Sequence, residues 1–302
     1  MKRCSDLTID WRKVLKTSAL GLWYLIRIAA AVLIVWWCFG KVNEWNNFQV
    51  FRQWNDHYGF MGSGTYEDPY LINSAEDLIK FSDAVNNGNS FNDIYFRQTA
   101  DIDLQNYGSF EPIGELNSGY MFSGIYDGGC HKISNLYINA NDLDCSFVGL
   151  FGKLGGVVMN LGIESGRIYG DYVGAFASTD GSDEAMIINC YNNADLYAMV
   201  RCGGIADNFS SGKIFGCANY GHLSGMVTCQ IVAYDCALIS GCCNLETSND
   251  SIVPYDTFRG NIYDCFIGTG SVSELNRFIP DYQDSIVYHE ITDIDVLPWP
   301  EG

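Results

Sequence analysis

Two aspartates set two residues apart are the first residues in this sequence that could do chemistry. Asp101 and Asp103 stand in the stretch TADIDL, where strand alternation points both side chains to the same side. Paired carboxylates can hold calcium, or act as acid and base in an enzyme that cleaves sugar chains. No further Asp, Lys or Arg recurs beside them to complete a catalytic site. We therefore favour hydrogen bonds from both carboxylates to backbone amides at a corner, with calcium binding as the alternative.

Other motifs for catalysis or metal binding are absent from the sequence. The stretch HEITD, residues 289–293, lacks the second histidine of a zinc-protease motif. The sequence contains no G-x-S-x-G, no phosphate-binding loop and no C-x-x-C pair. We therefore identify no catalytic residue, and we expect no cofactor apart from the calcium alternative.

Tyrosine could bind a ligand without any catalysis. The chain has 19 tyrosines, and an outward row of tyrosine and asparagine side chains suits stacking on sugars or gripping a protein. The alternative is that these rings only fill or decorate the fold. The candidates for a binding face are Tyr120, Tyr126, Tyr137, Tyr169, Tyr172, Tyr191 and Tyr220.

Charge is distributed unevenly along the chain. Residues 1–50 carry seven basic and three acidic residues, a net of +4, whereas the remainder carries 10 basic and 33 acidic residues, a net of −23. So acidic a body repels phosphate backbones, which argues against nucleic acid as a partner.

An apolar stretch follows the basic start. Residues 17–40 are long enough, at about 1.5 Å per residue, to cross a hydrocarbon layer of ~30 Å. Basic residues before the stretch place the tail 1–16 in the cytoplasm and the body outside, in the periplasm or extracellular. We favour an uncleaved, single-pass signal-anchor; the alternative is a signal peptide cleaved after Gly40, which would secrete the body. Arg27, inside the stretch, could pair with a partner transmembrane helix.

The body repeats a short pattern at regular intervals. Six stretches share two alternating apolar residues, a small or polar residue, and then Leu or Cys, at spacings of 25, 29, 27, 25 and 23. Glycine-broken apolar runs, such as GLFGKLGGVVMNLGI at 149–163, indicate short strands rather than helices. In a parallel β-helix each repeat forms one coil, and equivalent strands stack about 4.8 Å apart. We predict an all-β, right-handed parallel β-helix (a solenoid) over residues 93–272.

The recurring Leu or Cys position predicts a column of side chains inside this solenoid. Leucine and cysteine interchange there, which favours an inward position where free thiols pack as small hydrophobes. Disulfides between neighbouring coils are the alternative, because Cα atoms about 5 Å apart tolerate them. The predicted core column holds Leu136, Leu161, Cys190, Cys217, Cys242 and Cys265.

Further segments flank the solenoid. Residues 74–87 have the pattern of an amphipathic helix with Ser74 as N-cap, and we expect it to cover the first coil within an N-terminal cap at 63–92. Residues 41–62 are expected to form a membrane-proximal stem. Residues 273–302 are expected to form an acidic C-terminal cap or tail.

Several of these motifs resemble the GLUG-repeat family. GLFG at 149–152 followed by NLGI, the run NCYNNADLYA at 189–198, and the lead-in GTYEDPYLINSAEDLIKFSDAVNNG at 64–88 occur in family order, and the resemblance covers about residues 62–245. The family consists of β-helical modules of exported bacterial surface proteins, including non-catalytic regions of proteins like IgA proteases. The resemblance implies a β-helical fold and a surface location, and it implies no activity.

Three functions remain open on these observations. The leading hypothesis is a membrane-anchored extracellular β-helix that binds or adheres to a host or microbial surface glycan or protein. The first alternative is a carbohydrate-active enzyme, either a polysaccharide lyase or a glycoside hydrolase. The second alternative is a structural subunit of a membrane complex.

Overall fold

The computed structural model describes residues 58–115, 119–143, 145–240, 242–244, 261–263 and 266–267. All helices and strands named below belong to one compact unit, Phe60–Gly302. No helix in these ranges is long and apolar enough to cross a membrane. The predicted membrane segment 17–40 and the predicted tail 273–302 lie outside the described residues.

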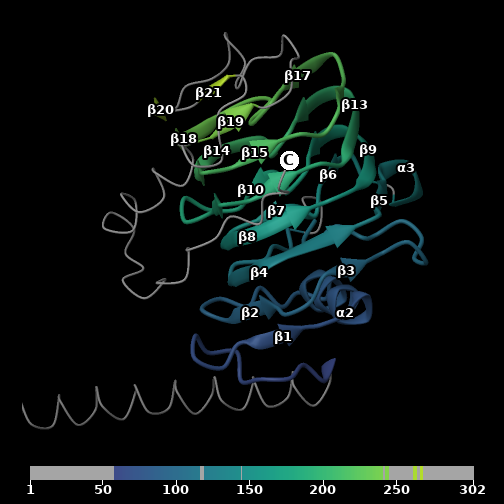
Figure 1. Ribbon diagram of the computed structural model, residues 1–302, viewed down its shortest axis with the longest axis vertical. Coiled ribbons are helices and arrows are strands. Elements are labelled where there is room, and N and C mark those ends of the chain that lie inside the picture. The colour runs from purple at the N-terminus through teal and green to yellow at the C-terminus, as the bar shows by residue number, and fades with distance from the viewer. Residues whose placement is uncertain are drawn as a thin grey trace, which may run out of the picture. The chain divides into compact units, whose positions relative to one another are not determined.

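The described strands wind into a parallel β-solenoid whose turns stack on one another (Figure 1). The predicted parallel β-helix is therefore confirmed. The large sheet contains fifteen described strands: β1 (Tyr70–Ile72), β2 (Tyr95–Gln98), β3 (Ile102–Asp103), β4 (Ile125–Ser134), β7 (Phe151–Leu154), β8 (Val157–Ile163), β10 (Ala177–Asp180), β11 (Met186–Ile188), β12 (Tyr191–Asn192), β14 (Ala206–Phe215), β15 (Ala218–Asn219), β18 (Cys236–Ser240), β19 (Cys243–Asn244), β20 (Asn261–Tyr263) and β21 (Phe266–Ile267).

A small sheet forms another wall of the solenoid. It contains six described strands: β5 (Leu136–Asn139), β6 (Phe147–Val148), β9 (Gly166–Gly174), β13 (Asp195–Gly203), β16 (Leu223–Ser224) and β17 (Val227–Cys229). Two helices complete the described elements: α2 (Ala75–Asn86) and α3 (Ala140–Leu143).

The register of the large sheet gives the length of each turn. In one row of register partners, the successive steps in sequence number are 32, 29, 27, 25 and 23, close to the predicted period. The row consists of Ile125, Val157, Met186, Lys213, Leu238 and Asn261.

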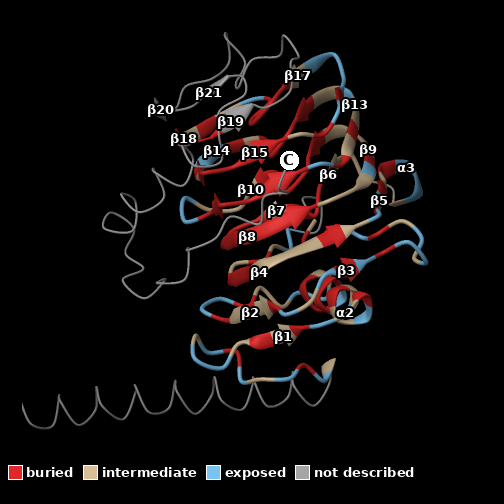
Figure 2. Cartoon of the chain, viewed as in Figure 1, coloured by how far each residue is buried: buried red, intermediate tan, exposed pale blue. Residues whose placement is uncertain are grey.

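The residue that follows each of these positions faces the core. Tyr126, Val158, Ile187, Ile214 and Ile239 stand in register and are each 0% exposed. Burying a large apolar side chain stabilises a fold by about 1.5–3 kcal/mol, so such columns hold successive turns together. Figure 2 shows buried residues along the large sheet from β4 to β18.

Most of the predicted core column is present. Register places Cys190 beside Leu161, then Cys217 and Cys242 in the next two turns, and all four side chains are buried. The three cysteines are free thiols. Cys265 lies outside the described residues.

Leu136 does not belong to this column, and that part of the prediction is wrong. Leu161 pairs with His131, whereas Leu136 pairs with Gly166 in the small sheet. The reason is that Asn135 and Leu136 stand where β4 passes into β5 of the small sheet, so they lie against Ser165 and Gly166 of the next turn. Asn160 and Leu161 lie inside β8 of the large sheet, although the same Asn-Leu pair occurs at both places.

Asparagines form one corner of the solenoid. Asn160 and Asn189 have φ angles of 53° and 52°, and Gly216 takes the equivalent place with φ 58°. Asparagine tolerates this left-handed region because its short polar side chain can hydrogen-bond locally. Here Nδ2 of Asn189 donates to Oδ1 of Asn160 at 2.7 Å, and Nδ2 of Asn160 donates to Oδ1 of Asp127 at 3.1 Å. Side-chain hydrogen bonds thus connect this corner in three successive turns.

Helix α2 matches the predicted amphipathic helix at 74–87. Its N-cap is Ser74, whose Oγ accepts from the backbone N–H of Asp77 at 3.2 Å. Its buried face includes Phe81, whose ring lies 4.5 Å from that of Phe96 and 5.0 Å from that of Phe122. The helix therefore packs against the first turns.

Candidate binding site

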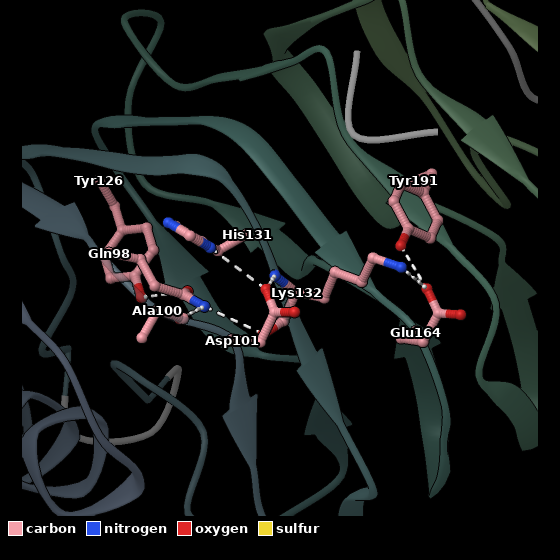
Figure 3. A network of polar contacts seen from close by, with 8 residues as sticks. All are labelled: Gln98, Ala100, Asp101, Tyr126, His131, Lys132, Glu164 and Tyr191. Atoms are coloured by element: carbon pink, nitrogen blue, oxygen red, sulfur yellow. Dashed lines mark hydrogen bonds and ion pairs between the residues drawn. The ribbon is translucent and has the colours of Figure 1, made fainter. Parts of the chain in front are cut away.

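Two of the predicted binding tyrosines are buried, which corrects that prediction. Tyr126 and Tyr191 are each 0% exposed. Tyr126 points inward, and its hydroxyl donates to Oε1 of Gln98 at 3.0 Å (Figure 3). Tyr191 lies over Gly162, where an added Cβ would come within 2.4 Å of the ring, and its hydroxyl donates to Glu164. Burial, and then the Glu164 carboxylate, raise the pKa of Tyr191.

The two candidate calcium ligands are engaged in hydrogen bonds within the chain. Oδ1 of Asp101 accepts from the backbone N–H of Lys132 at 3.1 Å and lies 3.2 Å from Nδ1 of His131 (Figure 3). Oδ1 of Asp103 accepts from Nδ2 of Asn135 at 2.8 Å, which lowers the pKa of Asp103. Across the described ranges, no group of three or more His, Cys, Asp and Glu residues could hold a metal ion. This geometry fits the structural interpretation of the pair, and calcium binding there stays a prediction.

Two other predicted tyrosines and a third ring lie together on the outer face of the small sheet. The rings of Tyr169 on β9 and Tyr197 on β13 stack 4.8 Å apart at an interplanar angle of 9°. Tyr137 on β5, 39% exposed, meets Tyr169 edge to face at 6.2 Å. The preceding residues Ile168 and Leu196 are fully buried, so alternation turns the stacked rings outward.

A hollow of about 420 Å³ opens beside this stack. One side is formed by α3 and the residues after it, and the other by β9 and β13. The volume falls in the range of about 300–1,000 Å³ that is usual for small-molecule sites. The lining includes Asn141, Ser146, Tyr169, Asp171, Tyr197 and Met199.

The chemistry of this hollow is polar with an apolar rim. Among its described lining residues, Asp171 is the one that carries a charge; Asn141 and Ser146 add an amide and a hydroxyl. Tyr169 and Tyr197 cover one face of each other, and Tyr137 and His222 contact them from the neighbouring strands, so a ligand meets ring edges and hydroxyls. Met199, 73% exposed, supplies apolar surface at the edge.

A smaller hollow of about 90 Å³ adjoins the first, since Cys145 lines both. Glu111 and Glu115 contribute to its lining. Asn86 also lines it, but its amide is used: Nδ2 donates to the carbonyl of Pro112 at 3.0 Å, and Oδ1 accepts from the backbone N–H of residue 114 at 2.8 Å. The small hollow therefore lies next to the larger one on the side of the first turns, and the candidate site is the larger hollow.

The ring of Tyr172 is covered by other side chains of the same chain, so Tyr172 offers no open ring face to a ligand. Phe147 stacks on it at 4.6 Å, and the guanidinium of Arg201 lies 4.6 Å from its ring centroid and 4.5 Å from that of Tyr234. Nε of Arg201 donates to Oδ1 of fully buried Asp207 at 2.9 Å. Burial raises the pKa of Asp207, and the arginine opposes that rise.

The last two candidates lie apart from the described lining of either hollow. Tyr120 is 43% exposed in the segment before β4. Tyr220 is partly buried and meets Tyr191 edge to face at 6.2 Å. Of the seven predicted tyrosines, Tyr169 lines the larger hollow, and Tyr137 contacts its ring from the neighbouring strand.

Tyr197 and Asp171 are site residues that sequence reasoning missed. A signal for Tyr197 exists in the repeat, since GRIYG at 166–170 and ADLYA at 194–198 align the two tyrosines, and the register pairs them. For Asp171 we find no such signal, because the hollow beside it depends on α3, which lies outside the repeat pattern.

No family model matches the chain. The chain is 35% identical over 123 residues to halomucin of Haloquadratum walsbyi, a match that covers 37% of this chain and 1% of that protein. It is 34% identical over 119 residues to a "Putative Gly-rich membrane protein" of Evansella cellulosilytica, covering 37% of this chain and 12% of that protein. The chain thus spans a small fraction of either curated relative. Among solved structures, a "putative immunoglobulin A1 protease" from Bacteroides ovatus is similar at a TM-score of 0.48 and 21% identity, covering 68% of this chain and 77% of that one.

Proposed function

We propose that this chain is a non-catalytic binding module at the bacterial cell surface, and that its ligand is a neutral glycan held in the hollow beside Tyr169 and Tyr197. The observation that carries the proposal is the outward tyrosine stack set against a polar hollow of about 420 Å³. A scaffold of paired strands holds the stack rigidly, which reduces the entropy cost of binding.

The lining favours a neutral sugar over an acidic one. Asp171 would repel a uronate or sulfate group, whereas its carboxylate accepts hydrogen bonds from sugar hydroxyls. Asn141, Ser146 and the tyrosine hydroxyls both donate and accept, as sugar hydroxyls do. The net charge of −19 also repels acidic polysaccharides, which again favours a neutral ligand.

A binding screen tests the proposal. The full-length chain is applied to an array of neutral, amino and acidic glycans, and the hit is quantified by calorimetry. Tyr197→Ala should weaken binding about tenfold, equivalent to about 1.4 kcal/mol. Tyr120→Ala is the matched control, because this exposed tyrosine lies away from the described lining and should bind unchanged.

Two outcomes would contradict this proposal. An equal loss of glycan affinity in Tyr197→Ala and Tyr120→Ala would show that the hollow is not the binding site. Release of reducing or unsaturated sugar ends during incubation would instead support the enzyme alternative, for which the hollow offers one carboxyl group among its described lining residues rather than the pair that glycosidases use.

We also propose the finer features that the sequence predicts: right-handed winding, GLUG-type repeats, a capping role for α2, and anchoring by residues 17–40. The apolar length of that segment and the basic residues before it support anchoring. Alkaline extraction of cell membranes should leave the full chain in the pellet, and protease added outside intact spheroplasts should digest the body. Recovery of the chain in the alkaline supernatant would reject the anchor.

A further inference from the structure

A second apolar cluster lies on the outside of the large sheet. Its members come from four consecutive strands of the ladder, β4, β8, β11 and β14. We call it the outer strip; it consists of Ile125, Val157, Met159, Met186, Ile188 and Phe215.

Strand alternation shows that these side chains face outward. Val158 belongs to the fully buried core column, so its neighbours Val157 and Met159 point to the opposite face. Register continues this arrangement, since Val157 pairs with Met186 and Met159 with Ile188. The strip is therefore two adjacent rows of three apolar side chains each, which together span four turns. Lys213 follows Met186 in one row, and Asp127 precedes Met159 in the other.

The outer strip is almost inaccessible to solvent. Its six residues are between 2% and 9% exposed, whereas Met199 and Met226, which also point outward, are 73% and 83% exposed. The strip faces away from the core, so another part of the same chain must shield it. Tyr95 and Leu238 pack against the strip, but they belong to the flanking strands of the same sheet and lie beside it rather than over it. The described strands form the walls of the solenoid, and the described helices pack elsewhere, α2 against the first turns and α3 beside the hollow.

We propose that the C-terminal stretch SIVYHEITDIDVLPW, residues 285–299, docks along the outer strip. More than half of this stretch is Ile, Val, Leu, Tyr or Trp, which suits a segment with one face on an apolar surface. Residues 293–296 alternate, so an extended chain there sets Ile294 and Val296 toward the strip and Asp293 and Asp295 toward water. Lys213 lies in the Val157 row, next to Met186, and offers a charge partner.

The chain can reach the strip. The stretch 268–284, which separates Ile267 from Ser285, spans up to about 56 Å when extended. From β20 to β8 the sheet has four strand spacings of about 4.8 Å each, or ~19 Å. Residues 41–57 of the predicted stem suit the strip less well, because fewer than half of them are apolar.

Photo-crosslinking of the full-length chain tests the docking. A benzophenone amino acid replaces Met186, and the chain is mixed with an isotope-labelled copy of itself before irradiation. We expect intramolecular crosslinks to peptides within 285–299. The same replacement at Met199, exposed and outside the strip, should give none to that stretch. Crosslinks to the labelled copy would assign the strip to self-association, and crosslinks to 41–57 would assign it to the stem; either result overturns the proposal.

Methionine oxidation by peroxide provides a second measurement, with Met199 and Met226 as internal references. In the full chain Met159 and Met186 should oxidise at least several-fold more slowly than these two. Ile294→Asp combined with Val296→Asp should speed oxidation of Met159 and Met186 several-fold and leave Met199 unchanged. If Met159 and Met186 oxidise at the same rate in this double variant as in the wild-type chain, the proposal is overturned. Neither test involves a glycan, so both are independent of the proposed function.

Discussion

Buried cysteine replaces leucine in the core of this solenoid, and its chemistry is that of an apolar residue. Sγ of Cys217 donates to the carbonyl of Phe215 at 3.3 Å, and the backbone N–H of Cys217 lies 3.4 Å from Sγ of Cys242. Burial is the largest cause that raises the pKa of Cys217 well above its ordinary value. Nucleophilic attack requires the thiolate, so Cys217 is chemically quiet. Cys190 and Cys242 are each 0% exposed, which shields them from reagents in solution.

We therefore expect slow alkylation of the column in the native chain. At about pH 8, iodoacetamide should label partly buried Cys145 well before Cys190, Cys217 or Cys242, because Cys145 is more accessible. Mass spectrometry of quenched samples measures the rates, and labelling in urea provides the fully reactive control. A disulfide between any two of the column residues would contradict the thiol interpretation.

The Arg201–Asp207 pair should matter far more than a surface ion pair. Arg201→Ala leaves a fully buried carboxylate without its cation, and we expect a loss of about 3–5 kcal/mol in the free energy of unfolding at neutral pH. The double variant Arg201→Ala with Asp207→Asn should recover part of that loss. Urea unfolding measures both, and an equal loss in both variants would show that the stacking on Tyr172 and Tyr234 dominates.

The pH dependence of this pair has a defined sign. Because burial raises the pKa of Asp207, the folded chain holds the proton at a higher pH than the unfolded chain does. The contribution of Asp207 to the free energy of unfolding is therefore full at pH values below its pKa in the unfolded chain. It is lost as the pH rises through its pKa in the folded chain. This loss of stability with rising pH should be larger in Arg201→Ala, because the arginine no longer opposes the rise in the pKa of Asp207. The difference in stability between Arg201→Ala and wild type should therefore be smallest at acidic pH.

At the scale of elements, neighbouring turns fit one another through paired choices of residue. Gly162 in β8 and Tyr191 in β12 stand in register, and the absent side chain of the glycine makes room for the ring of the next turn. This pairing explains why Tyr191, which the sequence suggests is exposed, is buried. It also shows that the burial of a strand residue depends on the residue that lies opposite it in the neighbouring turn.

Gly162→Ala should destabilise the solenoid, because the new Cβ would lie 2.4 Å from the ring of Tyr191. We expect a loss of about 1–3 kcal/mol, as for other overpacked interiors, measured by urea unfolding. Gly108→Ala is the matched control, since an added Cβ there meets nothing within 4 Å and should change stability little. Similar results for the two variants would contradict the packing argument.

The whole molecule carries a net charge of −19, which repels itself when the chain is compact. Raising NaCl from about 20 mM to about 200 mM should therefore increase the thermal midpoint, because salt screens this repulsion. KCl should act equally. An increase with calcium at concentrations too low to screen would instead support the calcium alternative at Asp101 and Asp103.

The sequence is sufficient to predict the period, the parallel solenoid and helix α2, because each leaves a local pattern of alternation or capping. Leu136 shows the limit of that pattern: the same Asn-Leu pair occurs at the passage from β4 to β5 and inside β8, and the local motif does not distinguish the two places. The burial of Tyr191 was not predictable from its own strand, because it depends on Gly162 one turn away. The hollow was not predictable either, since α3 and the stack meet only in the folded chain.

The turns of this solenoid differ in length, and that has a consequence for how the chain can change. Across the large sheet the successive register steps in sequence number are 26, 30, 32, 29, 27, 25 and 23. The strands stay paired through all these steps, so the connecting segments absorb the differences in length. Residues can therefore be gained or lost in a connection without breaking the ladder of strands, because lengthening a loop costs little free energy.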